Sequence, residues 1–149
     1  MEKQLHLQLK ELVLRLERRV GILQDIVMSC CNITPAQCHS LLEIGRAKNL
    51  SLIDLAETLG LDSSTISRSV NSLVNDGLVD RQTDPVNRRY VTISLTEDGE
   101  KIFEALQTAS AIYYRKILQQ IPKEKHNVVL QGLKLLLEAF DKSDNREEE

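Results

Sequence analysis

Residues 50–96 constrain the fold of this chain more than any other stretch, because two short helical patterns, a tight turn and two strand patterns follow one another there. Ser51 is a favourable N-cap, Gly60 suits the left-handed position that ends a helix, and Asp62 can cap the next helix. Apolar side chains then recur at helical spacing on one side of each helix, at Leu52, Leu55, Ala56, Leu59, Ile66, Val70, Leu73 and Val74. This pattern predicts a helix-turn-helix.

The opposite face of the second helix is polar and has almost no acid. Arginine can pair with guanine, while Ser, Thr and Asn reach base edges or phosphates. We therefore predict that this face enters the major groove of double-stranded DNA, although a solvated Ser-rich helix with no ligand is the alternative. The face consists of Ser63, Ser64, Thr65, Ser67, Arg68, Asn71 and Ser72.

A β-hairpin is predicted after Gly77, because one strand begins at Leu78 and a second alternates apolar and polar residues from Tyr90 to Leu95. Asp84 can hydrogen-bond Arg88 across the intervening loop and fix its direction. Arg89 would then be free to reach a minor groove, whose narrow form attracts arginine. The alternative is an ordinary charged hairpin tip.

These residues resemble the MarR family of bacterial transcriptional regulators. The likeness rests on residues 64–68, 73–79, Arg81, 84–89 and 95–99, and on the length and helix order of the chain. It implies a mainly α fold with a small β-hairpin wing, which is a winged helix-turn-helix with N- and C-terminal dimerisation helices. It also implies a wing braced by an Asp84–Arg88 pair, and a repressor that binds a pseudo-palindromic operator as a homodimer until an effector releases it.

We expect a single domain over residues 1–149. Residues 34–96 would form the winged helix-turn-helix unit, and residues 1–33 and 97–140 would supply the dimerisation helices. The first and last helices are too apolar for one small unit to cover, so two copies would bury these faces against each other. Pro122 is expected to begin the last helix, whose predicted buried residues are Val129, Leu133, Leu136, Leu137 and Phe140.

The net charge of −3 is low for a DNA-binding protein, but it is unevenly distributed. Residues 141–149 hold five acids and two bases, and the other 140 residues hold 17 of each. We expect the acidic tail to be disordered. A neutral body can still bind DNA through a local patch, here Arg68, Arg81, Arg88 and Arg89.

Other classes of protein find little support. No apolar run of about 18 residues could span a membrane, and no secretory segment follows the N-terminus, so we expect a cytoplasmic protein. His6, His39 and His126 fall on three different predicted helices, and catalytic motifs are absent, so we expect neither an enzyme nor a required cofactor. A winged-helix module that binds only protein remains an alternative.

Cys30, Cys31, Cys38 and His39 cluster around a predicted break between two helices. Cys30 and Cys31 end the first of these helices, and Cys38 lies near the N-terminus of the next, where a thiol tends to have a lower pKa. Brought together, the three thiols could sense a thiophilic metal or metalloid, or an oxidant. They could instead form a zinc site with His39, or act as small hydrophobic residues in a hairpin core. The resemblance offers a further effector, a small anionic aromatic bound in the crevice between the dimer helices and the DNA-binding unit.

Overall fold

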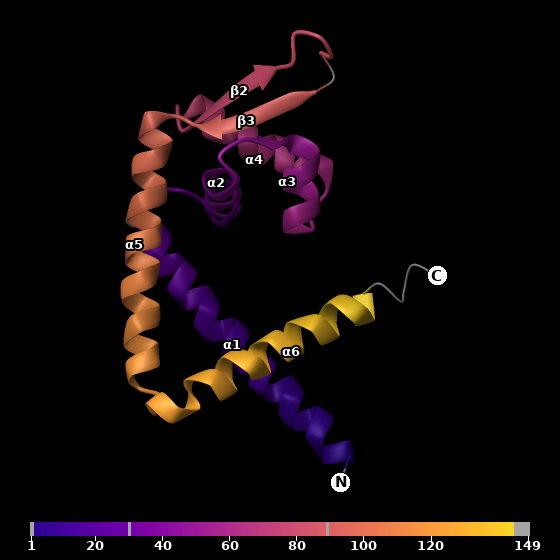
Figure 1. Cartoon of the computed structure of the whole chain (residues 1–149), viewed down its shortest axis with the longest axis vertical. Helices are drawn as coiled ribbons and strands as arrows, with labels where there is room; N and C mark the ends of the chain where they lie inside the picture. Colours follow the sequence, from indigo (N-terminus) through magenta and orange to yellow (C-terminus); the bar gives the residue numbers. More distant parts are fainter. Residues whose placement is uncertain (1, 30, 89, 145–149) are drawn as a thin grey trace. The chain divides into compact units, whose positions relative to one another are not determined.

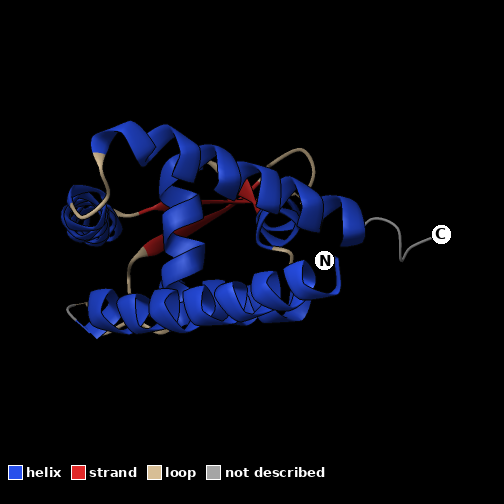
Figure 2. Ribbon diagram, turned by 90° about the horizontal axis from the view of Figure 1, so that it is seen from below, coloured by secondary structure: helices blue, strands red, loops and turns tan. Residues whose placement is uncertain are grey.

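The computed structural model describes residues 2–29, 31–88 and 90–144, and it divides into two compact units, Met1–Ala109 and Ser110–Glu149. Most of the described chain is helical, with one small sheet (Figure 2). The first unit contains α1 (Glu2–Ser29), α2 (Pro35–Ala47), β1 (Leu50–Ser51), α3 (Leu52–Leu59), α4 (Ser63–Asn75), β2 (Val79–Thr83), β3 (Val91–Leu95) and the start of α5 (Glu97–Gln119) (Figure 1). The second contains the rest of α5, a 3-10 turn (Lys123–Lys125) and α6 (His126–Asp144).

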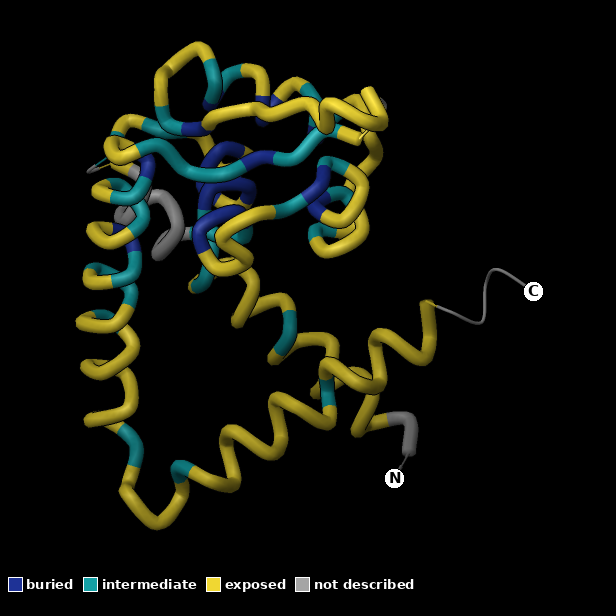
Figure 3. The backbone as a smooth tube through the Cα atoms, turned by 45° about the horizontal axis from the view of Figure 1, so that its top comes forward, coloured by how far each residue is buried: buried dark blue, intermediate teal, exposed yellow. Residues whose placement is uncertain are grey.

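The core of the first unit lies where α2, α3, α4, the sheet and α5 meet. Among the described residues, the buried ones are concentrated in this part of the chain (Figure 3). Four of the eight predicted core residues are fully buried. The other four are partly buried and pack against this core: Leu52, Ala56, Leu59 and Val74. The predicted inward faces of both helices are therefore confirmed, with the buried positions at Leu55, Ile66, Val70 and Leu73.

The helix-turn-helix forms because each helix end has a suitable residue. Ser51 Oγ accepts a hydrogen bond from Asp54 N at 3.0 Å, which caps α3. Gly60 ends α3 at φ 62°, ψ 32°, a left-handed conformation that costs glycine little. Asp62 then caps α4 through Thr65 N at 3.1 Å. The predicted boundaries and caps of this motif are confirmed.

The sheet has three antiparallel strands in the order β1-β3-β2, one more than the predicted hairpin. Strand β1 pairs Leu50 with Ile93 and Ser51 with Thr92. Strand β2 pairs with β3 over five residues, from Val79↔Leu95 to Thr83↔Val91. The extra strand was missed because two residues are too few to show an alternation. It joins the wing to the start of α3.

Helix α5 is joined to the end of α4 by Thr96. Its hydroxyl donates to Gly77 O at 2.6 Å and accepts from Gly99 N at 3.0 Å, so one side chain caps α5 and binds the turn after α4. Leu78 O lies so close to Gly99 that an added Cβ would overlap it. The start of α5 is therefore positioned against the turn that follows α4.

The terminal helices expose their apolar residues in the single chain (Figure 3). On α1, Leu5, Leu9, Leu12 and Leu16 are 47–63% exposed. On α6, the residues predicted to be buried are exposed or half-buried, with Val129 at 37% and Leu137 at 62%. The sequence led us to expect that a second copy covers these faces, and that contact stays a prediction.

Two boundaries near the C-terminus differ from the predictions. Pro122 does not begin α6: it precedes the 3-10 turn, and α6 starts at His126. The helix also continues through residues 141–144, which we had assigned to the acidic tail. A four-residue polar continuation costs a helix little, so composition alone places this boundary too early. No helix in the described ranges is long and apolar enough to cross a membrane.

Candidate nucleic-acid interface

The polar face of α4 is largely open to solvent. Ser63, Ser64, Arg68 and Asn71 are exposed, as the helical spacing predicts. Thr65 and Ser67 are half-buried, so their hydroxyls lie at the edge of the face. These six residues form a continuous donor and acceptor surface over the first two and a half turns of the helix.

Ser72 does not belong to this face, although we predicted it there. Its hydroxyl accepts a 2.8 Å hydrogen bond from Gln37 Nε2 of α2, and the residue is half-buried. On the helix Ser72 lies next to Arg68, so its spacing alone placed it on the polar face, and only the position of α2 gives it an internal partner. The face predicted to contact DNA therefore ends at Asn71.

Asp62 organises the N-terminal end of the face. Its carboxylate accepts hydrogen bonds from the hydroxyls of Ser64 and Thr65 and from Thr65 N. The hydrogen bond from the Ser64 hydroxyl has the largest effect, followed by those from the Thr65 hydroxyl and backbone N–H. Together they hold the pKa of Asp62 well below its usual 3.8. In the unbound chain two of the predicted DNA-contacting hydroxyls thus donate to a carboxylate whose ionised form they stabilise.

Arg68 lies along the helix toward this same end. Its Nε donates to Ser64 O at 3.3 Å, a long hydrogen bond at an exposed site. Such a weak contact costs little to break. The guanidinium can therefore leave the helix surface to meet a base edge without leaving a buried acceptor unsatisfied.

Arg81 connects the wing to α4. It lies on β2, exposed, and its Nη2 donates to Asn71 Oδ1 at 2.6 Å. Both residues were predicted to contact DNA, but the pairing between them was not foreseen. Ten positions separate them in sequence, so only the folded turn and strand bring them together.

The wing loop is ordered mainly by Asp84. Its Oδ1 accepts from Val86 N at 2.7 Å and from Asn87 N at 3.2 Å, an Asx-type turn. The loop closes through Asp84 N to Tyr90 O at 2.9 Å and Tyr90 N to Asn87 O at 2.8 Å. Among the described residues no ion pair joins Asp84 to Arg88, so the wing brace stays a prediction. Arg88 is exposed, and Arg89 lies outside the described residues.

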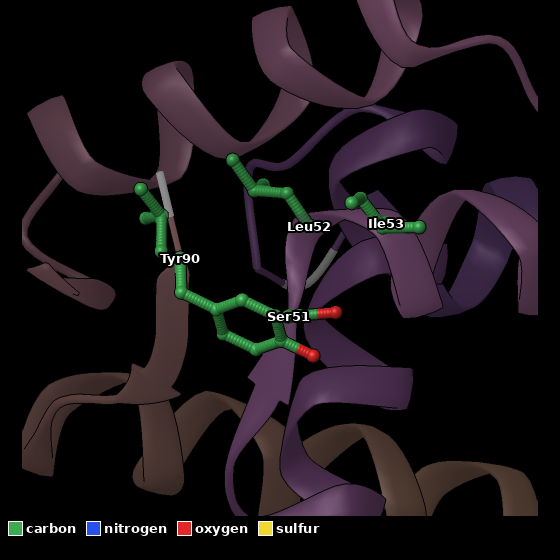
Figure 4. A pocket seen from close by; sticks show the side chains of 5 residues that line it. Ser51, Leu52, Ile53 and Tyr90 are labelled. Atoms are coloured by element: carbon green, nitrogen blue, oxygen red, sulfur yellow. The ribbon is translucent and has the colours of Figure 1, made fainter. Parts of the chain in front are cut away.

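A small hollow of about 190 Å³ lies beside the first residues of β3, at the loop end of the strand (Figure 4). It is bounded by the start of α3 on one side and by the entry to β3 on the other. Most of its lining is apolar, and two of the residues are largely exposed, Ile53 at 67% and Tyr90 at 52%. The lining residues are Ser51, Leu52, Ile53, Tyr90 and Val91.

The cysteine cluster is only partly described. Cys38, with 8% of its surface exposed, belongs to the hydrophobic core, and Cys31 packs partly buried against that core. His39 is exposed, and Cys30 lies outside the described residues. Within the described ranges, no three His, Cys, Asp or Glu side chains gather closely enough to hold a metal ion.

Comparison with protein families and known relatives agrees with this geometry. A family model described as "MarR family" matches residues 32–89, which cover α2 to the wing. The uncharacterized HTH-type transcriptional regulator YfiV of Bacillus subtilis is 28% identical over 105 residues. That alignment covers 70% of this chain and 66% of YfiV, just under two thirds of the relative's length. This relative is named as a transcriptional regulator, in agreement with the sequence-based expectation that the chain is not an enzyme.

Two solved structures share the fold over nearly the whole chain. Streptococcus pneumoniae FabT in complex with DNA has a TM-score of 0.84 at 20% identity and covers 92% of this chain and 98% of its own. A Cys-to-Ser mutant of MarR from E. coli, complexed with operator DNA, has a TM-score of 0.75 at 25% identity. It covers 87% of this chain and 93% of its own.

Proposed function

We propose that this chain, which resembles the MarR family over residues 32–89, is a DNA-binding transcriptional regulator that acts as a homodimer on a pseudo-palindromic operator. The observation that carries the proposal is the joined surface of α4 and the wing, on which Arg68, Asn71, Arg81 and Arg88 are exposed. The two similar structures crystallised with DNA support the same reading.

In the proposed complex α4 enters the major groove. Arg68 would pair with a guanine, and Ser63, Ser64, Thr65, Ser67 and Asn71 would contact base edges or phosphates. The wing would lie along the adjacent minor groove, where Arg88 and Arg89 would meet its negative potential. A rotation of Arg88 toward Asp84 on binding would complete the predicted brace, since Asp84 keeps a second carboxylate oxygen beside the loop.

The homodimer accounts for the exposed apolar faces of α1 and α6. Leucines at 47–63% exposure along about three turns of α1 would favour aggregation if no partner covered them. A two-fold dimer would present two copies of α4 about 34 Å apart, one turn of DNA, which is the spacing of a palindromic site.

A repressor of this kind releases DNA when an effector binds, and two effectors fit the sequence. One is a thiophilic metal or metalloid, or an oxidant, acting on Cys30, Cys31 and Cys38, with or without His39. The other is a small anionic aromatic between the dimer helices and the DNA-binding unit. The packing of Cys31 and Cys38 against the core favours the second, because it gives these thiols a structural role.

The test is binding of the purified protein to DNA from upstream of its own gene, followed by fluorescence anisotropy at several salt concentrations. We expect a sedimenting dimer and an affinity that falls steeply with salt. Arg68→Ala should cost about 1–3 kcal/mol at the operator and less on unrelated DNA.

Arg115→Ala, which removes an exposed arginine of α5 with no proposed DNA contact, is the matched control. A stable monomer at micromolar concentration would contradict the dimer. Equal losses in the Arg68 and Arg115 variants would contradict the docking of α4. A protein that binds no DNA would instead be a winged-helix module for a protein partner.

A further inference from the structure

A polar seam joins the first two turns of α2 to one side of α4 and to Asp76, the C-cap residue of α4. Ser69 and Ser40 share a hydrogen bond at 3.0 Å, and Ser69 Oγ also donates to Ala36 O at 3.1 Å. One turn further along α4, Gln37 Nε2 donates to Ser72 Oγ at 2.8 Å and to Asp76 Oδ2 at 3.0 Å. No buried side-chain donor or acceptor of the described residues lacks a partner, so the seam is fully satisfied.

Gln37 uses its whole amide in this seam. Its Oε1 accepts from Thr34 N at 2.8 Å, which completes the capping box of α2, and its Nε2 donates to Ser72 of α4 and to Asp76, the C-cap residue of α4. A carboxylate cannot donate, so the Asp76 contact fixes which end of the amide faces α4. With 6% of its surface exposed, Gln37 makes these bonds where water competes poorly.

The residues on the α4 side are poor choices for helix stability alone. Serine inside a helix has lower propensity than alanine, and Asp76 places a negative charge at the C-terminal end, where the helix dipole disfavours it. Apolar side chains would pack α2 against α4 at least as well, but they would leave α4 freer to rotate. Directional hydrogen bonds instead select one rotation of α4 about its own axis.

We propose that Gln37 is a positioning residue for DNA recognition: it fixes the rotation of α4 and so decides which base edges Arg68 and Asn71 reach. The inference rests on the proposed DNA-binding function and adds a determinant of specificity that does not itself touch DNA. A rotated α4 would still offer donors to phosphates, so general affinity for DNA should survive while discrimination between sequences is lost.

Gln37→Glu separates this role from capping. The carboxylate still accepts from Thr34 N, so the capping box is kept, but it loses both donated bonds and stands against Asp76. Adding Asp76→Asn restores a hydrogen bond between positions 37 and 76 with donor and acceptor exchanged, because the new amide can donate to the new carboxylate. The double substitution also returns the net charge to that of the wild type. Thr34→Val is the matched control, since it removes the capping side chain and leaves the seam intact.

We would measure affinity for the operator and for unrelated DNA of equal length, together with thermal unfolding. Gln37→Glu should lower the ratio of the two affinities about tenfold, the size of one lost base contact, and the double variant should recover most of it. Thr34→Val should lower thermal stability and keep the ratio. If Gln37→Glu keeps the wild-type ratio, or if the double variant fails to recover it, the inference is overturned.

Two further outcomes are distinguishable. If the wild-type protein binds the operator no more tightly than unrelated DNA, the proposed function itself is contradicted, and with it the premise of this test. If Gln37→Glu alone does not fold, the double variant decides: wild-type discrimination supports the inference, and a folded double variant without discrimination overturns it.

Discussion

Arg81 Nη2 of β2 and Asn71 Oδ1 of α4 lie 2.6 Å apart, so the wing and the helix predicted to recognise DNA are joined through two side chains that both face solvent. A guanidinium has five donors, so one bond to Asn71 leaves others that can reach a phosphate. The pair can therefore orient Arg81 without consuming it.

This arrangement predicts non-additive effects on DNA binding. Asn71→Ala should weaken operator binding partly by releasing Arg81, and Arg81→Ala should remove the same oriented contact. The double variant should then bind only slightly more weakly than the worse single variant, with a coupling of about 0.5–1.5 kcal/mol. Anisotropy titrations of the four proteins measure the coupling. Strictly additive losses would mean that the two residues contact DNA independently.

Gly99→Ala should destabilise the fold by about 1–3 kcal/mol, because the new methyl group would overlap Leu78 O, a backbone atom that cannot rotate away. Gly45→Ala is the informative comparison, since its methyl group would meet the ring of Phe103, a side chain that can shift. Urea unfolding of both variants should rank Gly99→Ala as the more damaging. The reverse order would indicate that the turn before α5 yields more easily than the core.

The Asp62 cap predicts a component of acid sensitivity. Hydrogen bonds from Ser64 and Thr65 hold its pKa below the usual 3.8, so the unfolded chain takes up this proton first as the pH falls. The stabilisation is fully present above pH 3.8 and is lost as the pH falls toward the lower pKa of the folded state. Asp62→Asn keeps a capping oxygen without the charge, so its urea midpoint should fall less steeply between about pH 4 and pH 2. Parallel curves for the two proteins would contradict this assignment.

The same variant bears on DNA binding. Asp62 places a negative charge at the helix end that would approach phosphates, so Asp62→Asn should raise the affinity for all DNA sequences. An unchanged affinity at low salt would show that this end of α4 stays away from the backbone.

Local features of the sequence were sufficient to predict the helix-turn-helix. Ser51, Gly60 and Asp62 act on neighbours a few residues away, and the apolar period of α4 is visible along the chain itself, so each could be read without the fold. The capping box of Thr34 and Gln37 is another local feature, since the two residues lie only three positions apart in the sequence.

Contacts between distant segments could not be predicted in the same way. The Arg81–Asn71 bond and the Gln37 seam depend on where β2 and α2 lie against α4, which no local pattern encodes. The prediction that Ser72 lies on the exposed polar face of α4 was wrong for this reason. A stripe of Ser69, Ser72 and Asp76 at helical spacing was a usable hint, since three polar residues in line on a helix side often meet a polar partner.

The cysteines give the last prediction. Cys38 is 8% exposed in the core while Cys31 is only partly buried, so in the native protein a thiol reagent should modify Cys31 well before Cys38, and the difference should vanish in urea. Each rate is measured in a single-cysteine variant, with Cys→Ser at the other two positions. Cys38→Ser should also cost about 1–3 kcal/mol, because a hydroxyl replaces a thiol among apolar neighbours.

A triple Cys→Ser protein that still folds and binds the operator then separates the effectors. If arsenite, cadmium, zinc and peroxide change DNA affinity equally in the wild type and the triple variant, the cysteines are core residues and the anionic aromatic becomes the effector to test. A response confined to the wild type would identify the cysteine cluster as the sensor, acting on α2 and hence on the helix that α2 holds in place.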